Sequence, residues 1–344
     1  MAPAAGLLSC SNEVLTIIFS NPNLSKQDLK SLRLASKETC PVATMEFTKR
    51  YVIEPFVFLF QDGLQCLVKI CKNPILSLQI QSIGFLATSV DIRGLTKRVS
   101  DAEVAVTRYS NSSSLVDDLT IISDYARILR EQALLTASGD TEGLLTTALQ
   151  ALKQPVSITV VDDLQYVGSR RLVGLPVMTH YYDGNLSKPI TYILDFQPKM
   201  KSSLKLIEKV VAKLSSGEHV PLNGLKLKMS RRSQVKSYTS NPTLDSIMMQ
   251  HLSGAYSNLT TFHLDLDLDS LRCPVSFESI EELLKDVPKL QELALETSCT
   301  GTRPIGSSTL ERVAKLFGFD TNFELRVLVL QDVPCTLEGL HNLP

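Results

Sequence analysis

The sequence predicts an α/β protein in which a small helical module precedes a long region of alternating helices and parallel strands. Two patterns lead to this fold class. Three short apolar helical stretches occupy the first fifty residues, and beyond residue 55 an amphipathic helix followed by a strand of alternating leucines recurs. The composition agrees, because 344 residues that are 44% apolar can bury a large core. Neither metals nor disulfides are then needed for stability.

The first expected helix, over residues 12–20, is apolar on nearly every side. It is therefore expected to be buried on more than one side, with one side left for a partner. Asn21 and Pro22 end it. Ser25 then predicts the N-cap of a second helix, with Asp28 at the third helical position and Leu24 packed against Leu29. A third helical run covers residues 38–50.

These helices carry a recognisable motif, LLSCSNEVLTIIFSNPNLSKQDLKSLRLASKETCPVATMEF. Its most specific parts are N-E-V-L followed by I-F at residues 12–19, and D-L-K-S-L-R-L-x-S-K at residues 28–37. The segment from Leu7 to about Ile53 resembles the F-box of fungal F-box proteins that have a leucine-rich C-terminal region. The resemblance implies an F-box-like helical module over residues 1–53 that binds a Skp-type adaptor. The adaptor-binding positions it implies are Leu8, Cys10, Val14, Leu15, Ile18, Phe19, Leu29, Leu32 and Leu34.

Residues 54–344 show a degenerate helix and strand repeat. Its clearest copy is a helix over residues 280–287, then Pro288, then the strand pattern Leu290-x-x-Leu293-x-Leu295. The copies are farther apart than the roughly 20–29 residues of ordinary leucine-rich repeats, so the repeat is irregular and leucine-rich-repeat-like. Similar strands are expected at residues 222–227, 259–264 and 325–330, with helices at 204–214, 244–252 and 310–317; fainter strands at 75–83 and 156–160 follow helices at 64–71 and 144–152.

A helical insertion is expected around residues 84–140. Its helix would carry one apolar stripe, which is more typical of core packing than of a binding groove; the stripe is Leu115, Leu119, Ile122, Ala126 and Leu129. The repeats themselves should stack as an irregular solenoid, with parallel strands inside and helices outside. The strand at residues 325–330 is expected to be a sheet edge, followed by poorly held residues. The end of the sequence looks shortened relative to the family it resembles.

Polar side chains that alternate with the buried leucines should share the open face of the sheet, where solenoids commonly bind partners. His263, Asp265, Asp267 and Asp269 lie on one such face, ~6.6–7 Å apart. Two of them could bind a divalent cation, although a solvated strand face is the commoner meaning of this pattern. No motif for a nucleophile, a phosphate loop or a metal protease is present. We therefore expect a protein that is not an enzyme, with no catalytic residue, metal or cofactor.

The charges are balanced, with 35 Lys and Arg against 36 Asp and Glu. This balance argues against a general nucleic-acid binder or an anionic-membrane binder. Locally, residues 199–236 are basic and residues 265–296 mostly acidic. Two explanations stay open: neighbouring repeats neutralise one another, or the pattern forms a surface for an unknown protein target. The residues of that surface would be Lys226, Lys228, Asp265, Asp267 and Asp269.

The seven cysteines are odd in number and contain no C-x-x-C pair, so they are expected to be reduced thiols. No secretory signal or membrane-length apolar run is visible. We therefore expect a location in the cytoplasm, the nucleus or both. The resemblance implies a substrate-recognition subunit of an SCF-type cullin ubiquitin ligase. The alternative is a protein-protein interaction scaffold whose F-box-like segment no longer joins a ligase.

Overall fold

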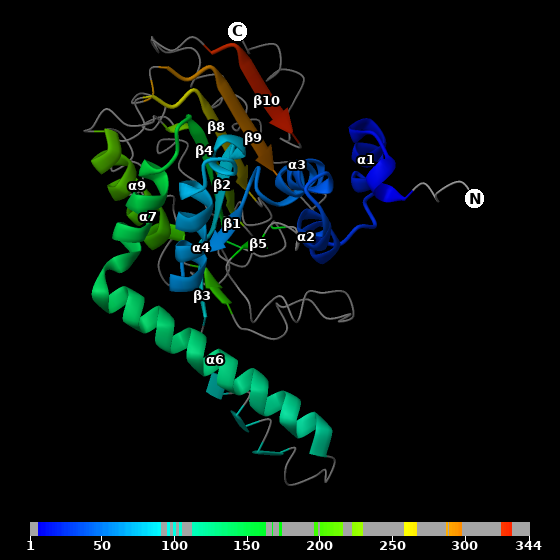
Figure 1. Ribbon diagram of the computed structural model, residues 1–344. Helices are drawn as coiled ribbons and strands as arrows, with labels where there is room; N and C mark the ends of the chain where they lie inside the picture. Colours follow the sequence, from blue (N-terminus) through cyan, green and yellow to red (C-terminus); the bar gives the residue numbers. More distant parts are fainter. Residues whose placement is uncertain are drawn as a thin grey trace.

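The computed structural model describes residues 6–90, 95–96, 99–100, 103–104, 112–162, 167, 172–173, 196–198, 200–215, 222–229, 258–266, 287, 289–297 and 325–331 (Figure 1). The helices are α1 (Asn12–Phe19), α2 (Lys26–Ala35), α3 (Thr39–Tyr51), α4 (Gln61–Lys72), α6 (Ser112–Ser138), α7 (Asp140–Gln150) and α9 (Met200–Ser215), with short 3-10 turns η1 (Leu7–Ser9) and η2 (Ser77–Gln79). The strands are β1 (Phe56–Phe58), β2 (Ser82–Leu86), β3 (Thr88–Val90), β4 (Val156–Val161), β5 (Leu172–Val173), β6 (Phe196–Pro198), β7 (Leu222–Met229), β8 (Thr261–Leu266), β9 (Glu292–Thr297) and β10 (Val327–Gln331).

The three expected N-terminal helices are present as α1, α2 and α3. Ser25 caps α2 as predicted: its hydroxyl accepts from the backbone N–H of Asp28, and the Asp28 carboxylate accepts from the backbone N–H of Ser25. Helix α3 packs against both α1 and α2. The buried side chains of this module belong to the same hydrophobic cluster as those of the sheet, so the module and the sheet share one core.

The strands form a parallel sheet in the order β10-β9-β8-β7-β4-β2-β1-β5, and each neighbouring pair is parallel. From β1 to β10 the strands of this sheet follow chain order, apart from β5. The predicted α/β class, with parallel strands and packed helices, is confirmed. A separate antiparallel pair joins β3 to β6.

Each strand expected from the repeat pattern exists, with one marked shift. The pattern predicts a strand from residue 75, whereas β2 begins only at Ser82. The reason is a turn after α4, in which the side-chain oxygen of Asn73 accepts from the backbone N–H groups of Ile75 and Leu76, each at 3.0 Å. The intervening residues then form η2 instead of a strand.

One face of the sheet is apolar across its whole width. Because side chains alternate along each strand, the parallel register lines up two rows of aliphatic and aromatic residues. These rows are Ile83, Ile158, Leu225, Phe262, Leu293 and Leu328, and Val57, Phe85, Val160, Leu227, Leu264, Leu295 and Leu330. Helices α4, α7 and α9 pack in sequence beside one another on one side of the sheet (Figure 1). Their buried residues join the same cluster as these rows.

The predicted helices at residues 64–71, 144–152 and 204–214 correspond to α4, α7 and α9. Those at 244–252 and 310–317 lie outside the described residues, as does all but Val287 of the one at 280–287.

Helix α6 accounts for the expected insertion and extends away from the sheet in Figure 1. Its predicted stripe is only partly buried: Ile122 and Leu129 are half-buried and Ala126 is exposed. Ile128 and Leu135, which the stripe did not include, are buried where α6 packs on α7, α4 and β3. The side chains of Leu115 and Leu119 lie outside the described residues.

Strand β10 ends the sheet among the described strands, as predicted for an edge. Val327 and Val329 of this strand are 46% and 41% exposed, whereas Ala294, which lies opposite Val329 on β9, is buried. The expectation that the residues after this strand are poorly held concerns residues outside the described part of the chain.

Close packing at Gly84 on β2 generates a stability prediction. A Cβ atom built there would overlap the ring of the buried Phe56 on the neighbouring strand, whereas a Cβ at Gly143 in α7 meets nothing within 4 Å. We expect Gly84→Ala to lower the free energy of unfolding by about 1–3 kcal/mol through overpacking. Gly143→Ala should raise it by up to about 1 kcal/mol through helix propensity. Urea unfolding of both variants measures the difference, and equal effects would contradict the packing argument.

Candidate functional site

The outward side of α1 is an apolar surface formed by Val14, Ile17 and Ile18, which we call the α1 face. These side chains are 43%, 73% and 39% exposed. Their spacing of three and four residues places them on one side of the helix. Elsewhere in the module Leu7, Leu34 and Met45 are also exposed. The α1 face is therefore a displayed hydrophobic surface next to a completed core.

The opposite side of α1 faces inward. Leu15, Phe19 and Leu29, which the resemblance assigns to an adaptor, are buried in the chain's own core. All three side chains therefore have an internal packing role. Leu15 and Phe19 face inward because the helical period puts them opposite the α1 face, and Leu29 is buried on α2. Leu32 and Cys10 are half-buried against the same core. The side chain of Leu8 lies outside the described residues.

Sequence reasoning omitted Ile17 from the expected adaptor-binding positions, although it is the most exposed residue of the α1 face. The available signal was the spacing of residues 14, 17 and 18, which is that of one helix side. That spacing shows that the three residues share a side, but only the packing of α1 on α3 shows that this side is the exposed one.

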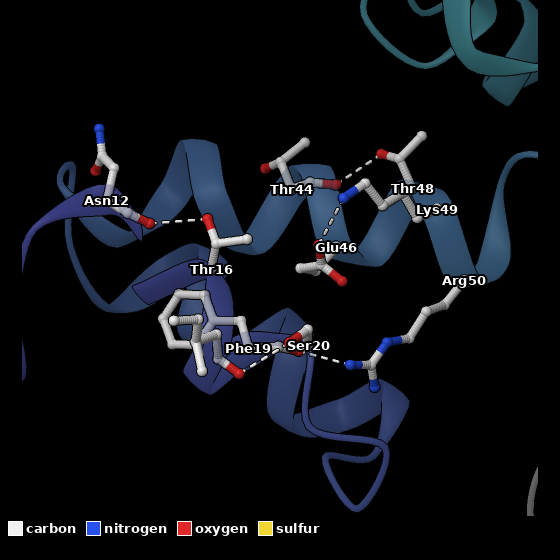
Figure 2. Close-up of polar contacts among 10 residues, drawn as sticks. Asn12, Thr16, Phe19, Ser20, Thr44, Glu46, Thr48, Lys49 and Arg50 are labelled. Atoms are coloured by element: carbon white, nitrogen blue, oxygen red, sulfur yellow. Dashed lines mark hydrogen bonds and ion pairs between the residues drawn. The ribbon is translucent and has the colours of Figure 1, made fainter. Parts of the chain in front are cut away.

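The position of α1 is fixed by Arg50 at the end of α3 (Figure 2). Its guanidinium donates to the carbonyl of Phe19, at 2.6 Å, and to the carbonyl of Leu24, at 3.3 Å. The first of these bonds satisfies a carbonyl at the C-terminus of α1, where a cation also interacts favourably with the helix dipole. Within α3, Lys49 pairs with the buried carboxylate of Glu46 at 2.9 Å. The helix that carries the α1 face is thus held on α3.

The second surface is the side of the sheet opposite the apolar rows. Near β1 it is apolar and buried, through Phe56 and Phe58, and toward β9 it becomes polar. We call the polar part the polar sheet face. It consists of Ser82, Ser157, Thr159, Lys226, Lys228, Thr261, His263, Asp265, Glu292 and Glu296.

Two charge contacts cross the strands of the polar sheet face. Lys228 Nζ lies 2.8 Å from the carboxylate of the directly opposite Asp265, which is buried. His263 Nε2 lies 3.2 Å from the carboxylate of Glu296 on the next strand. For Lys228 and Asp265 the structure therefore shows that charges on neighbouring strands neutralise each other. Asp267 and Asp269, also predicted for this surface, lie outside the described residues.

His263 is kept neutral by its surroundings. Burial lowers the pKa of the imidazole below its usual value of 6.5, and the nearby Lys226 lowers it further, against the opposing effect of Glu296. The contact with Glu296 is therefore a hydrogen bond from a neutral ring, and since a carboxylate accepts, Nε2 carries the hydrogen.

Lys226 occupies the centre of the polar sheet face, between Thr159 and His263 in the strand register. It is half-buried, and this burial lowers the pKa of its ammonium group, as does the charge of Lys228. Beside it, the carboxylate of Glu54 accepts from the hydroxyls of Ser82, at 3.2 Å, and Thr159, at 3.3 Å.

Several kinds of site are not seen in the described part of the chain. No group of three His, Cys, Asp or Glu side chains there could hold a metal ion. No helix there is both long and apolar enough to cross a membrane. The described cysteines, Cys10, Cys40, Cys66 and Cys71, are unbridged. Burial raises the pKa of Cys66 and raises that of Cys71 to about 12, so these two are not poised as nucleophiles.

Comparison with known proteins adds no assignment. The chain matches no protein-family model, and no curated protein matches it. The α1 face and the polar sheet face are therefore interpreted from their own geometry and from the sequence motif.

The depressed pKa of His263 predicts a pH-dependent stability. Between the lowered folded pKa and the usual 6.5 the unfolded chain binds more protons than the folded chain, so the free energy of unfolding falls as the solution is acidified through about 6.5. We expect His263→Asn to flatten the pH dependence in this window. Urea unfolding of the wild type and the variant between about pH 5 and pH 7.5 tests this. Parallel pH profiles would contradict the prediction.

Proposed function

We propose that this protein is a substrate-recognition subunit of an SCF-type cullin ubiquitin ligase. The observation that carries the proposal is the α1 face, in which three apolar side chains are displayed on a helix whose core side is already filled. Exposed apolar clusters of this kind mark protein interaction sites. The F-box-like motif occupies the same helices, and its resemblance to the F-box implies a Skp-type adaptor as the partner for this face.

The polar sheet face is the proposed site for the protein target. It lies on the parallel sheet, whereas the α1 face lies on the N-terminal helices, so the two surfaces are separate. In this proposed role the subunit performs no chemistry of its own. It raises the effective concentration of a target lysine near the ubiquitin-charged enzyme. The expected catalytic contribution of this chain is therefore positioning alone.

A second candidate function is an interaction scaffold that does not join a ligase. The burial of Leu15, Phe19 and Leu29 favours it, because these three expected adaptor contacts are engaged in the chain's own core. Loss of adaptor binding in an otherwise folded, partner-binding protein would be its signature.

The adaptor proposal is tested by charges placed on the α1 face. We expect Ile17→Asp with Ile18→Asp to abolish co-purification with a Skp-type adaptor, since removing a buried interface anchor costs ~2 kcal/mol or more. The fold should survive, because both side chains point outward. The matched control is Ile75→Asp, which alters an isoleucine 64% exposed after α4 and should leave co-purification unchanged.

Circular dichroism and thermal unfolding of each variant separate a binding defect from misfolding. Undiminished adaptor binding by a folded Ile17→Asp, Ile18→Asp variant would reject the α1 face as the adaptor site. A wild-type chain that captures no adaptor while remaining folded would favour the scaffold function instead.

A further inference from the structure

Lys226 is a half-buried cation that makes no direct contact with an anion among the described residues. Among the described residues it makes no hydrogen bond or ion pair, in contrast to Lys228, which pairs with Asp265 at 2.8 Å on the same face. Burial is the largest cause of the lowered pKa of Lys226. A charge that is partly removed from water and left unpaired costs free energy, which an incoming anion would recover.

Three carboxylates act electrostatically on Lys226, and each of them has another hydrogen-bond partner. Glu54 accepts from two hydroxyls, Asp265 accepts from Lys228, and Glu296 accepts from His263. All three attract Lys226 electrostatically, since each raises its pKa. None of them contacts it within hydrogen-bonding distance in the described structure. The electrostatic attraction therefore acts at longer range, and the ammonium group keeps its capacity to donate.

We propose that the polar sheet face recognises an acidic side chain, aspartate or glutamate, of the protein target, and that its carboxylate pairs with Lys226. The inference rests on the proposed function, because it takes the target to be the ligase substrate. His263 lies directly beside Lys226 in the strand register, and its side chain keeps 27% exposure. Because the N–H of the neutral His263 ring is donated to Glu296, the donor for the entering carboxylate is the ammonium group of Lys226.

The surrounding charge selects a carboxylate over a phosphate group. Lys228 adds positive potential at Lys226, whereas Glu54, Asp265 and Glu296 all add negative potential. A phosphate monoester carries about −1.5 to −2 charges at pH 7, so these carboxylates would repel it more strongly than they repel a carboxylate. A carboxylate, with a single negative charge, meets the smaller repulsion while it pairs with Lys226.

The test is a selection of random peptides, displayed on phage, on the immobilised full-length chain. Wild type should enrich peptides with Asp or Glu at one position. Lys226→Met should lose that preference, Lys226→Arg should keep it, and Lys226→Glu should replace it with Lys or Arg. The matched control is Lys205→Met, because Lys205 is exposed on α9, which packs on the other face of the sheet.

Synthetic peptides then measure the selectivity. The selected peptide is compared by fluorescence anisotropy with versions that carry Gln or phosphoserine at the acidic position. We expect wild type to bind the Gln version at least about tenfold more weakly than the acidic peptide. Lys226→Met should bind the two peptides equally. Lys226→Met should unfold at an unchanged or higher urea concentration, because it removes an unpaired charge, so any lost selectivity is not a loss of fold.

Three results would overturn the inference: no enrichment of acidic peptides by wild type, the same enrichment by Lys226→Met, or tighter binding of the phosphoserine peptide than of the acidic one. Co-purification of the wild-type chain with the adaptor is measured separately. If the adaptor is not captured but acidic selectivity depends on Lys226, the ligase function fails and the recognition site stands. If the adaptor is captured but binding shows no acidic selectivity, the ligase function stands and the recognition site fails.

Discussion

The register of the parallel sheet is the constraint on which both faces of the sheet depend. The two aligned apolar rows of the sheet face the side covered by α4, α7 and α9. A slip of one residue would turn this apolar set toward the opposite face and bring lysine and aspartate under the helices. The free energy of burying the apolar rows therefore also fixes which polar residues meet across the strands.

That register explains why charges on the polar sheet face are partly buried. Neighbouring strands are about 4.7–4.9 Å apart, so side chains at matched positions shield one another from water. Pairing compensates for the partial loss of water around Lys228 and Asp265, and His263 avoids the cost of burying a charge because its ring is neutral. Gly224 leaves the space that Ser157 and Thr261 fill on either side. Of these four ionisable side chains, only Lys226 has no hydrogen-bond or ion-pair partner within the described part of the chain. This supports the proposal that Lys226 recognises a carboxylate.

The helical module combines an exposed apolar surface with a buried apolar interior. Leu15, Phe19 and Leu29 are buried in the core that the module shares with the sheet, and Arg50 ties the end of α1 to α3. Because these contacts do not involve the α1 face, the exposed side chains are available for a partner while the helix position stays fixed. A binding surface built this way needs little reordering on association.

The sequence by itself determined most local elements: the capped helix at Ser25, the helices α4, α7 and α9, and the strands β4, β7, β8, β9 and β10 follow from periodicity and turn chemistry. It also placed Lys226, Lys228 and Asp265 on one face. It did not predict β1 or β5, and it began β2 too early. Tertiary structure decided which apolar positions of α1 are exposed, because a helix that is apolar all round has no preferred side until α3 covers one. It likewise decided the partners of each charge, since residues 228 and 265 meet only through the register of two strands separated by a long stretch of chain. Such pairings depend on distances between elements, which no pattern within one element contains.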